Sequence, residues 1–499
     1  MKRYFSTILC ISLFATLSVT ADSYWVAFSD KNGTTGDIDK PEEFLSERTL
    51  ARRSKYGIAI DSLDLPVSQA YIDSLRNIGA SILFTSRWMN GATIETGDSS
   101  IVATLSQWRF VKDVERTQCE ACYSPTHKRL PAIEQNASID YGQAATQTNM
   151  LQLHKLHDIG YQGSGMHIAV IDNGFSNVDK SDYFAYVRPR IIHTRNFVNP
   201  QVSVYATGEH GSSVLSCMAT KVEGYCGTAP EASYTLILTE DDKTEGLREV
   251  DAQVAAFEFA DSIGADIITS SLGYAFDFDD SATNIPYTML DGHHVRNSQA
   301  ATIAARKGIV VCISAGNEGN KAWHYISSPA DADSILTVGS VTAQGDKSPF
   351  SSFGPTADGR IKPDVCAMGT ATYLYDPVDD DISTSRGTSF STPIIAGTVA
   401  CLWQALPDLN NMQIIQRIVK SATQAHNPDN AIGYGIPNVW AAFLGNSDDI
   451  KEAVNDSSPT QTVFYSLQGI LIGTNEADLP PGIYIKTDGT MVHKMIVTK

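Results

Sequence analysis

Between residues 147 and 445, short apolar runs alternate with stretches whose apolar residues recur every three or four positions. The apolar runs lie at residues 167–171, 234–238, 265–269, 308–313 and 335–338. Helical spacing is shown between two of these runs by Val254, Phe257, Ala260 and Ile263. Wholly apolar strands that alternate with helices are typical of a parallel sheet covered by helices on both faces. The pattern predicts an α/β domain, whose reactive residues collect beyond the carboxyl ends of its strands.

A smaller unit with a different pattern precedes this domain. Strand-like stretches at residues 24–28 and 81–84 are combined with helix-like stretches at residues 68–78 and 100–107. This mixture predicts a small α+β unit over residues 22–117.

The remaining segments are polar or short. Residues 118–146 are irregular and polar, which indicates a linker or a processing region. Residues 446–462 form a second polar linker, and the chain closes with a short β-rich tail over residues 463–499.

The first 21 residues have the pattern of a signal peptide. Lys2 and Arg3 form a basic start, an apolar run follows at residues 8–19, and small residues end at Ala21. The run is shorter than the roughly 20 residues that span a bilayer. No later stretch is long and apolar enough for a membrane helix, so we expect an exported protein without a transmembrane segment.

Charge and composition exclude several classes of partner. The 499 residues carry 37 basic and 56 acidic side chains, a formal net charge of −19. Nucleic-acid backbones and anionic membrane surfaces need clustered Lys and Arg, so neither is expected as a partner. With 42% hydrophobic and 19% charged residues, the chain is expected to be globular.

The cysteines leave the disulfide pattern open. Of the eight, Cys10 lies in the leader, and an odd number remains, so at least one thiol is unpaired or bonds another chain. Cys119 and Cys122 form a single C-x-x-C without a second pair, which argues against a four-thiolate zinc site. A disulfide between Cys217 and Cys226 is one open possibility. The two cysteines in apolar runs are expected to be small buried hydrophobic residues: Cys312 and Cys401.

Three motifs fall where this architecture places chemistry. Asp172 ends the first apolar run in Val-Ile-Asp-Asn-Gly, His210 opens a helical stretch, and Ser389 opens another in Gly-Thr-Ser-Phe-Ser-Thr-Pro. A serine hydroxyl needs an imidazole to accept its proton, and the imidazole needs a carboxylate to orient it and stabilise its charge. These residues supply the three roles, and amide donors at a helix start favour negative charge near Ser389.

The chain order Asp, His, Ser differs from those of α/β-hydrolases and of chymotrypsin. The serine motif also lacks the last glycine of G-x-S-x-G, because Ser391 stands there. With these motifs the chain resembles the subtilisin-like serine proteases of family S8. Three further segments match that family in order: residues 227–232, 350–355 and 362–364.

The resemblance implies further site residues. Asn317 would be the oxyanion-hole asparagine, together with the backbone N–H of Ser389. An extended substrate would pair with Ser271, Leu272 and Gly273. The pocket for the residue before the cut would be lined by these residues and by the segment Ser314, Ala315 and Gly316, with Ser327 or Ser328 near its base. No buried carboxylate is evident for a basic side chain, so an apolar or broad preference is expected.

The resemblance also implies a zymogen. The α+β unit would be a prodomain that acts as an intramolecular inhibitor until it is cut away in the linker. The expected substrates of the mature enzyme are proteins or peptides. The arrangement is similar to exported peptidases of Bacteroidetes bacteria, and the tail resembles a shortened secretion sorting segment. Asn173 and Ser212-Ser213 depart from the common family pattern without touching a triad role. The expected location is therefore secreted or cell-surface associated.

Other functions remain open from the sequence. A catalytically degenerate homologue that binds peptides or a partner is the main alternative, and a sedolisin-type acid peptidase is disfavoured by His210. His293-His294 and His324 lack the spacing of a metal site, and residues 379–381 lack the pattern of an EF-hand loop. No metal or other cofactor is expected for catalysis. Structural calcium is possible by resemblance, with no site assigned.

Overall fold

The computed structural model describes residues 22–118 except Ser99, residues 139–445, and parts of the tail. The described tail residues are 463–465, 471–473, Asn475, Leu479, 482–487 and 492–497. The expected signal peptide at residues 1–21, the Cys119/Cys122 pair, most of the linker at residues 118–146 and the linker at residues 446–462 lie outside the described residues.

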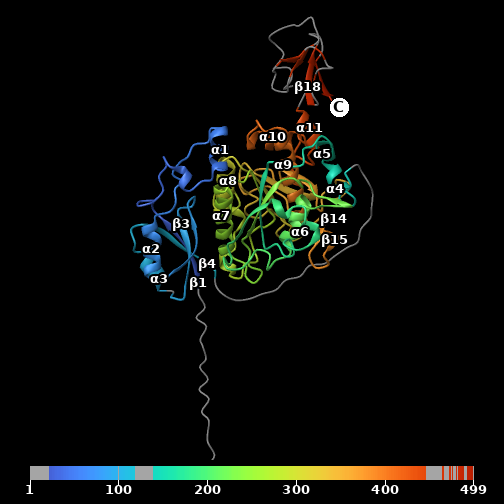
Figure 1. Ribbon diagram of the computed structural model, residues 1–499. Coiled ribbons are helices and arrows are strands. Elements are labelled where there is room, and N and C mark those ends of the chain that lie inside the picture. The colour runs from blue at the N-terminus through green and yellow to red at the C-terminus, as the bar shows by residue number, and fades with distance from the viewer. Residues whose placement is uncertain are drawn as a thin grey trace, which may run out of the picture.

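A seven-stranded sheet forms the centre of the large domain (Figure 1). Its order is β13-β12-β11-β10-β5-β9-β6, and each recorded pair is parallel. The strands are β5 (His167–Asp172), β6 (Ile191–Asn196), β9 (Ser233–Leu238), β10 (Ile267–Ser270), β11 (Val310–Ser314), β12 (Leu336–Val341) and β13 (Val365–Met368). The predicted α/β fold is confirmed, and every predicted apolar run overlaps a strand.

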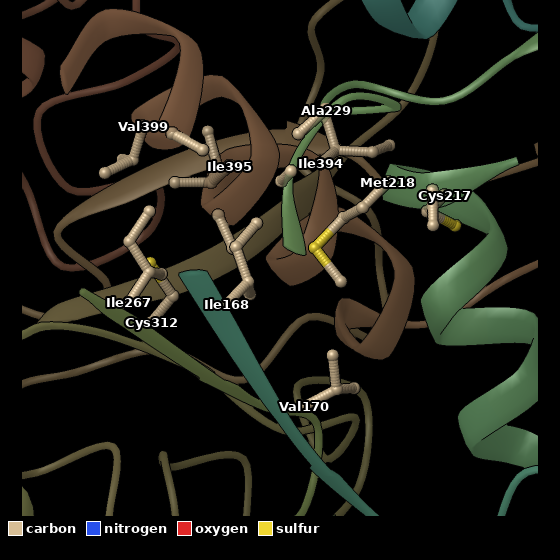
Figure 2. Close-up of a cluster of buried hydrophobic side chains, with 14 of the residues drawn as sticks. Ile168, Val170, Cys217, Met218, Ala229, Ile267, Cys312, Ile394, Ile395 and Val399 are labelled. Atoms are coloured by element: carbon tan, nitrogen blue, oxygen red, sulfur yellow. The ribbon is translucent and has the colours of Figure 1, made fainter. Parts of the chain in front are cut away.

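Helices cover both faces of the sheet, which explains why the strands are apolar throughout. In β5, Ile168 and Val170 face one core, whereas Ala169 and Ile171 face the other. The first core is closed by α6 (His210–Ala219) and α9 (Thr388–Ala405), and the second by α7 (Leu247–Ser262) and α8 (Arg296–Arg306). Figure 2 shows side chains of the first core: Ile168, Ile267 and Cys312 from the strands, with Met218, Ile394, Ile395 and Val399 from the helices.

The cysteines in the described part of the chain are all free thiols. Cys312 and Cys401 are completely buried, as predicted. The suggested pairing of Cys217 with Cys226 in a disulfide is wrong, because both residues are free thiols. Each thiol instead lies 3.5 Å from a carbonyl oxygen of its own segment, Cys217 from Ser213 O and Cys226 from Gly227 O.

The N-terminal unit has the predicted α+β architecture. Its antiparallel sheet has the order β2-β3-β1-β4. Its elements are β1 (Asp22–Phe28), α1 (Glu47–Tyr56), α2 (Gln69–Asn77), β2 (Ser81–Ser86), β3 (Gly91–Thr96), α3 (Ile101–Leu105) and β4 (Val111–Gln118). The hydrophobic pattern did not predict α1, because its buried positions are Thr49, Arg52 and Arg53 rather than apolar residues.

Those arginines contact the large domain through Asp261 of α7, next to which the N-terminal unit lies in Figure 1. The buried Asp261 carboxylate accepts from Arg52 at 2.6 Å, from Arg53 at 2.9 Å and from Arg87 at 3.1 Å. One turn earlier, Glu258 accepts from the backbone N–H groups of Arg87 and Trp88 at 2.9 and 3.1 Å. These contacts fix the unit on the outer face of α7.

The tail forms a separate small sheet of order β17-β16-β18-β19. Its antiparallel strands are β16 (Val463–Tyr465), β17 (Leu471–Gly473), β18 (Gly482–Thr487) and β19 (Val492–Val497). Among the described residues, none of the helices combines the length and apolar character that crossing a bilayer requires.

Candidate active site

Neighbouring strand ends bring three of the predicted segments to one edge of the sheet. Asp172 is the last residue of β5, and Ser271 and Ala315 directly follow β10 and β11. Ser270 of β10 is in register with Ile171 of β5 on one side and with Ile313 of β11 on the other. Parallel strands end together, so these residues share the carboxyl edge of the sheet, as the sequence pattern predicted.

Asp172 and His210 form a close pair. His210 Nδ1 lies 2.7 Å from Asp172 Oδ1, and that same oxygen accepts from the Asn173 backbone N–H at 2.9 Å. Asp172 is completely buried, and its Oδ2 has no partner among the described residues. The carboxylate fixes the orientation of the imidazole and leaves Nε2 free to accept a proton.

Gly211 lets the start of α6 approach the end of β5 closely enough for this contact. A Cβ atom on Gly211 would clash with Gly174 O and would lie 2.9 Å from Asp172 Cβ. A larger residue would push His210 away from the carboxylate. The Gly in His-Gly is therefore required by packing.

Two opposing effects set the pKa of His210. Burial lowers it, but the adjacent Asp172 carboxylate, through charge and hydrogen bonding, and Asp242 together raise it above the ordinary value of 6.5.

Imidazole must be neutral to act as a general base. We therefore expect kcat/KM to rise with pH along a limb that titrates one proton with a pKa above 6.5, measured with a peptide substrate. A profile with an acidic optimum would contradict a base role for His210.

Ser389 is the second residue of α9 and is 7% exposed. Its Oγ lies 3.5 Å from Ser271 O, and no hydrogen bond joins it to His210 among the described residues. The starts of α6 and α9 are nevertheless close, because the rings of His210 and Phe390 have centroids 5.7 Å apart. Catalytic hydrogen bonds are often long without substrate and shorten in the complex.

Asn317 is anchored at the start of the same helix. Its Oδ1 accepts from the backbone N–H of Thr388 at 2.9 Å and from Thr388 Oγ1 at 3.1 Å. Its NH₂ group has no acceptor among the described residues. As a first-turn residue of α9, Ser389 also has a backbone N–H without an intrahelical acceptor. Two unused donors near a helix start can stabilise an oxyanion.

Sequence reasoning missed the role of Thr388. Its side-chain oxygen accepts from the Gly316 backbone N–H at 3.2 Å while donating to Asn317. Thr388 thereby ties Asn317 and Gly316 to the residue beside Ser389. The sequence signal that could have indicated this role is the position of Thr388 directly before Ser389 in the Gly-Thr-Ser motif.

The predicted substrate-pairing segment has unused backbone groups. Ser271 is held in place because its Oγ donates to Ser389 O at 2.8 Å. Leu272 and Gly273 make no backbone hydrogen bonds to other described residues, and Gly273 is exposed. The segment can pair with an extended peptide in the manner of an added strand. Across from it, Ser314 and Ala315 are buried.

One acidic group could hold a metal ion. Within the described parts of the chain, a single set of three ligand side chains has its ligand atoms within 4.8 Å of one another: Glu240, Glu245 and Glu249. Burial first, and neighbouring carboxylates second, raise the pKa of each, that of Glu245 to about 7. Glu249 already accepts from the backbone N–H groups of Asp241 and Gly246 at 2.9 and 3.0 Å, which caps α7. No sequence spacing indicated this cluster.

The other candidates for metal binding have structural partners. His294 Nδ1 lies 2.8 Å from Asp291, and the His324 ring stacks on Phe353. The acidic residues at 379–381 lie in the hairpin of β14 (Thr372–Asp376) and β15 (Asp381–Ser385). There Asp380 accepts from the Tyr375 hydroxyl at 2.7 Å, and Asp381 accepts from the Tyr183 hydroxyl at 2.5 Å.

Comparisons with known proteins match both main parts of the chain. The model of the subtilase family, peptidase S8, matches residues 163–435. The model of the peptidase S8 propeptide domain of Bacteroidota matches residues 23–130.

Individual relatives give the same result. Subtilisin NAT of Bacillus subtilis subsp. natto is 28% identical over 345 residues, covering 69% of this chain and 80% of its own. Serine protease AprX of Bacillus subtilis (strain 168) is 28% identical over 326 residues, covering 58% of this chain and 66% of its own. A solved structure also aligns, the crystal structure of the epidermin leader peptide processing serine protease EpiP from Staphylococcus aureus. The TM-score is 0.58 at 16% identity, and the alignment covers 85% of this chain and 98% of EpiP. At that identity the likeness concerns the fold.

Proposed function

Because the chain belongs to the subtilase family of serine peptidases, we propose that it is a secreted endopeptidase that hydrolyses proteins through an acyl-enzyme on Ser389. The observation that carries this proposal is the Asp172–His210 pair, 2.7 Å apart, beside the start of the helix that bears Ser389. The pair supplies an oriented base, and Asn317 with the Ser389 backbone supplies oxyanion donors.

The reaction follows from these positions. His210 Nε2 accepts the Ser389 Oγ proton as Oγ attacks the peptide carbonyl carbon, and the Asn317 NH₂ and the Ser389 N–H stabilise the oxyanion. His210 then gives that proton to the leaving amine as the C–N bond breaks. In the second half, water attacks the ester carbonyl carbon while His210 accepts its proton; the bond between the acyl carbon and Ser389 Oγ then breaks, His210 returns the proton to Oγ, and the carboxylic acid product is released. We propose that no metal or other cofactor takes part in these steps.

We propose that the N-terminal unit inhibits the enzyme until the chain is cut between residues 118 and 146. Its last described strand ends beside the loop before α7, where a Cβ atom on Gly246 would lie 3.2 Å from Thr117 O. This loop follows β9, whose partner strand β5 ends at Asp172. The apolar leader and the export of subtilisin-type enzymes support secretion, released or held at the cell surface.

Asp261→Asn should loosen the N-terminal unit. The substitution removes the anionic partner of the buried Arg52 guanidinium and one of two partners of Arg53 and Arg87, which keep Asp64 and Glu258. Breaking a buried ion pair in this way costs about 3–5 kcal/mol. Made in a Ser389→Ala background, so that nothing is cut, it should speed hydrogen exchange in α1 by about 10²- to 10³-fold. The matched control is Asp73→Asn, because Asp73 and Arg76 form an exposed pair at 3.0 Å, whose loss costs under about 1 kcal/mol. Equal exchange in both variants would refute the role of Asp261.

Labelling with a fluorophosphonate tests the proposed function. An activated serine reacts rapidly, so mass spectrometry should find the label on Ser389, a mature amino terminus beyond residue 118, and fragments of a denatured protein mixture. Absence of label and of cleavage would favour the degenerate, peptide-binding alternative. The observation that supports this alternative is that, among the described residues, Ser389 Oγ contacts Ser271 O and not His210.

A further inference from the structure

The substrate-pairing segment, residues 271–273, is attached to the rest of the domain at both of its ends. Ser270 ends β10 directly before the segment, and its Oγ accepts from Gln253 Nε2 of α7 at 3.0 Å. Tyr274 directly follows the segment, and its backbone N–H and C=O pair with Ser328 at 2.8 and 3.0 Å. The segment is therefore held at its ends, whereas the unpaired backbone groups along its middle stay open to a substrate.

The two attachments belong to one continuous set of buried hydrogen bonds. Gln253 Oε1 accepts from Asn297 Nδ2 at 2.8 Å, and Asn297 lies in the first turn of α8. Asn297 Oδ1 in turn accepts from the Ser328 hydroxyl. All of these side chains are completely buried: Ser270, Gln253, Asn297 and Ser328. The bonds thus run from one end of the segment, through α7 and α8, to its other end.

A buried carboxylate completes this set. Ser328 Oγ lies 2.8 Å from Ser298 Oγ, and Ser298 donates to Asp331 Oδ1 at 2.6 Å. The second carboxylate oxygen, Oδ2, accepts from the Gly292 backbone N–H at 2.7 Å. We refer to the six linked side chains as the buried network: Ser270, Gln253, Asn297, Ser328, Ser298 and Asp331. None of their buried side-chain nitrogens or oxygens lacks a partner, and a fully satisfied polar network is rigid.

Stability alone does not explain a polar network in this place. The core between the sheet and these helices is apolar, and it includes Val254 of α7 and Ala300 of α8. Well-packed apolar residues in place of buried polar groups are often as stable or more stable. Hydrogen bonds differ from apolar contacts because they fix direction and spacing, whereas hydrophobic contact is non-directional. The network therefore contributes geometry to the segment that it flanks.

We propose that Gln253 and Asn297 are positioning residues, which hold the substrate-pairing segment in the geometry that an extended peptide requires. Neither residue contacts the substrate, because both act through Ser270 and Ser328. The proposal rests on the proposed function and deepens it, because it makes an extended polypeptide the favoured substrate. A peptide that pairs as an added strand needs backbone donors and acceptors at fixed spacing, and a segment that is ordered beforehand binds it at a lower cost.

Two substrates that share the residue before the cut bond test the proposal: an extended pentapeptide and a single-residue ester. Gln253→Met keeps most of the side-chain volume and removes both hydrogen bonds of Gln253. Ser270→Ala removes only the hydroxyl that accepts from Gln253, and it guards against misfolding of the methionine variant. Each variant should lower kcat/KM for the peptide by about ten- to a hundredfold, mostly through KM, and change that for the ester by less than about threefold.

The matched control is Thr398→Val, which also removes one buried side-chain hydrogen bond. Thr398 is completely buried in α9, and its Oγ1 donates to Ile394 O at 2.7 Å, outside the buried network. Its ratio of peptide to ester kcat/KM should stay within about twofold of that of the parent, because distant sites act independently. The rate of fluorophosphonate labelling at Ser389 reports whether the catalytic group of each variant is intact.

Two results would overturn the proposal while leaving the proposed function in place. One is a peptide-to-ester ratio in the folded variants equal to that of the parent. The other is an equal loss on both substrates together with slow labelling, which would mean that the network supports the whole active site rather than the segment. A parent that hydrolyses neither substrate and takes no fluorophosphonate would contradict the proposed function itself.

Discussion

Ser389→Ala should leave a folded precursor that neither processes itself nor cleaves other proteins. Turnover should fall by about 10⁶-fold, the loss known for subtilisin, a protein of the same family. Folding should be retained, because the Ser389 hydroxyl makes only a 3.5 Å contact with Ser271 O and its removal leaves no strong bond broken. Turnover on a denatured protein, the mass of the purified chain and its thermal unfolding measure the three effects.

The control for this variant lies two residues along the same helix. Ser391 is completely buried, and its Oγ donates to Thr388 O at 3.0 Å. Ser391→Ala should cost about 1 kcal/mol of stability and still process itself. Were Ser389→Ala to cleave as fast as the parent, Ser389 would not be the nucleophile.

Asp172→Asn should lower kcat/KM by about 10⁴-fold. Its Oδ1 accepts from both His210 Nδ1 and the Asn173 N–H, so an asparagine can keep its carbonyl oxygen in that place and hold the ring. What it loses is the negative charge that stabilises the imidazolium. The pKa of His210, raised by that charge against the effect of burial, should fall, and the acid limb of the pH profile should move to lower pH.

This pair of readouts separates charge from structure. A change that only disturbed packing would lower activity without moving the acid limb. Asp182→Asn, at an exposed aspartate, should change neither quantity. Activity of Asp172→Asn within tenfold of the parent would remove Asp172 from the catalytic group.

The sequence predicted the parts of the fold and site that depend on local pattern. Wholly apolar runs located the central strands, and Asp172 stood at the end of one of them. Helical runs that begin at His210 and just before Ser389 placed both residues at helix starts. The structure adds the 2.7 Å contact between Asp172 and His210, which their separate motifs implied only through known chemistry.

Features that depend on distant partners were not predicted. Helix α1 buries arginines, whose partner Asp261 lies more than 200 positions away. Strand β6 was missed because it is a largely exposed edge strand with polar residues. A periodicity cannot reveal such pairings, because each partner looks ordinary in its own stretch of sequence.

The contacts around Asp261 have a consequence for the enzyme after maturation. In the proposed maturation, Glu258 and Asp261 would stay with the catalytic domain, while Arg52, Arg53 and Arg87 would leave with the N-terminal unit. Each half of this contact is charged and hydrates readily once separated, unlike an uncovered apolar patch that would promote aggregation. The departing segment thus leaves charged groups that water can solvate beside the small apolar patch of Ala252 and Ala255, which Phe84 had covered. Dissolved salt, which screens exposed opposite charges, should hinder its return.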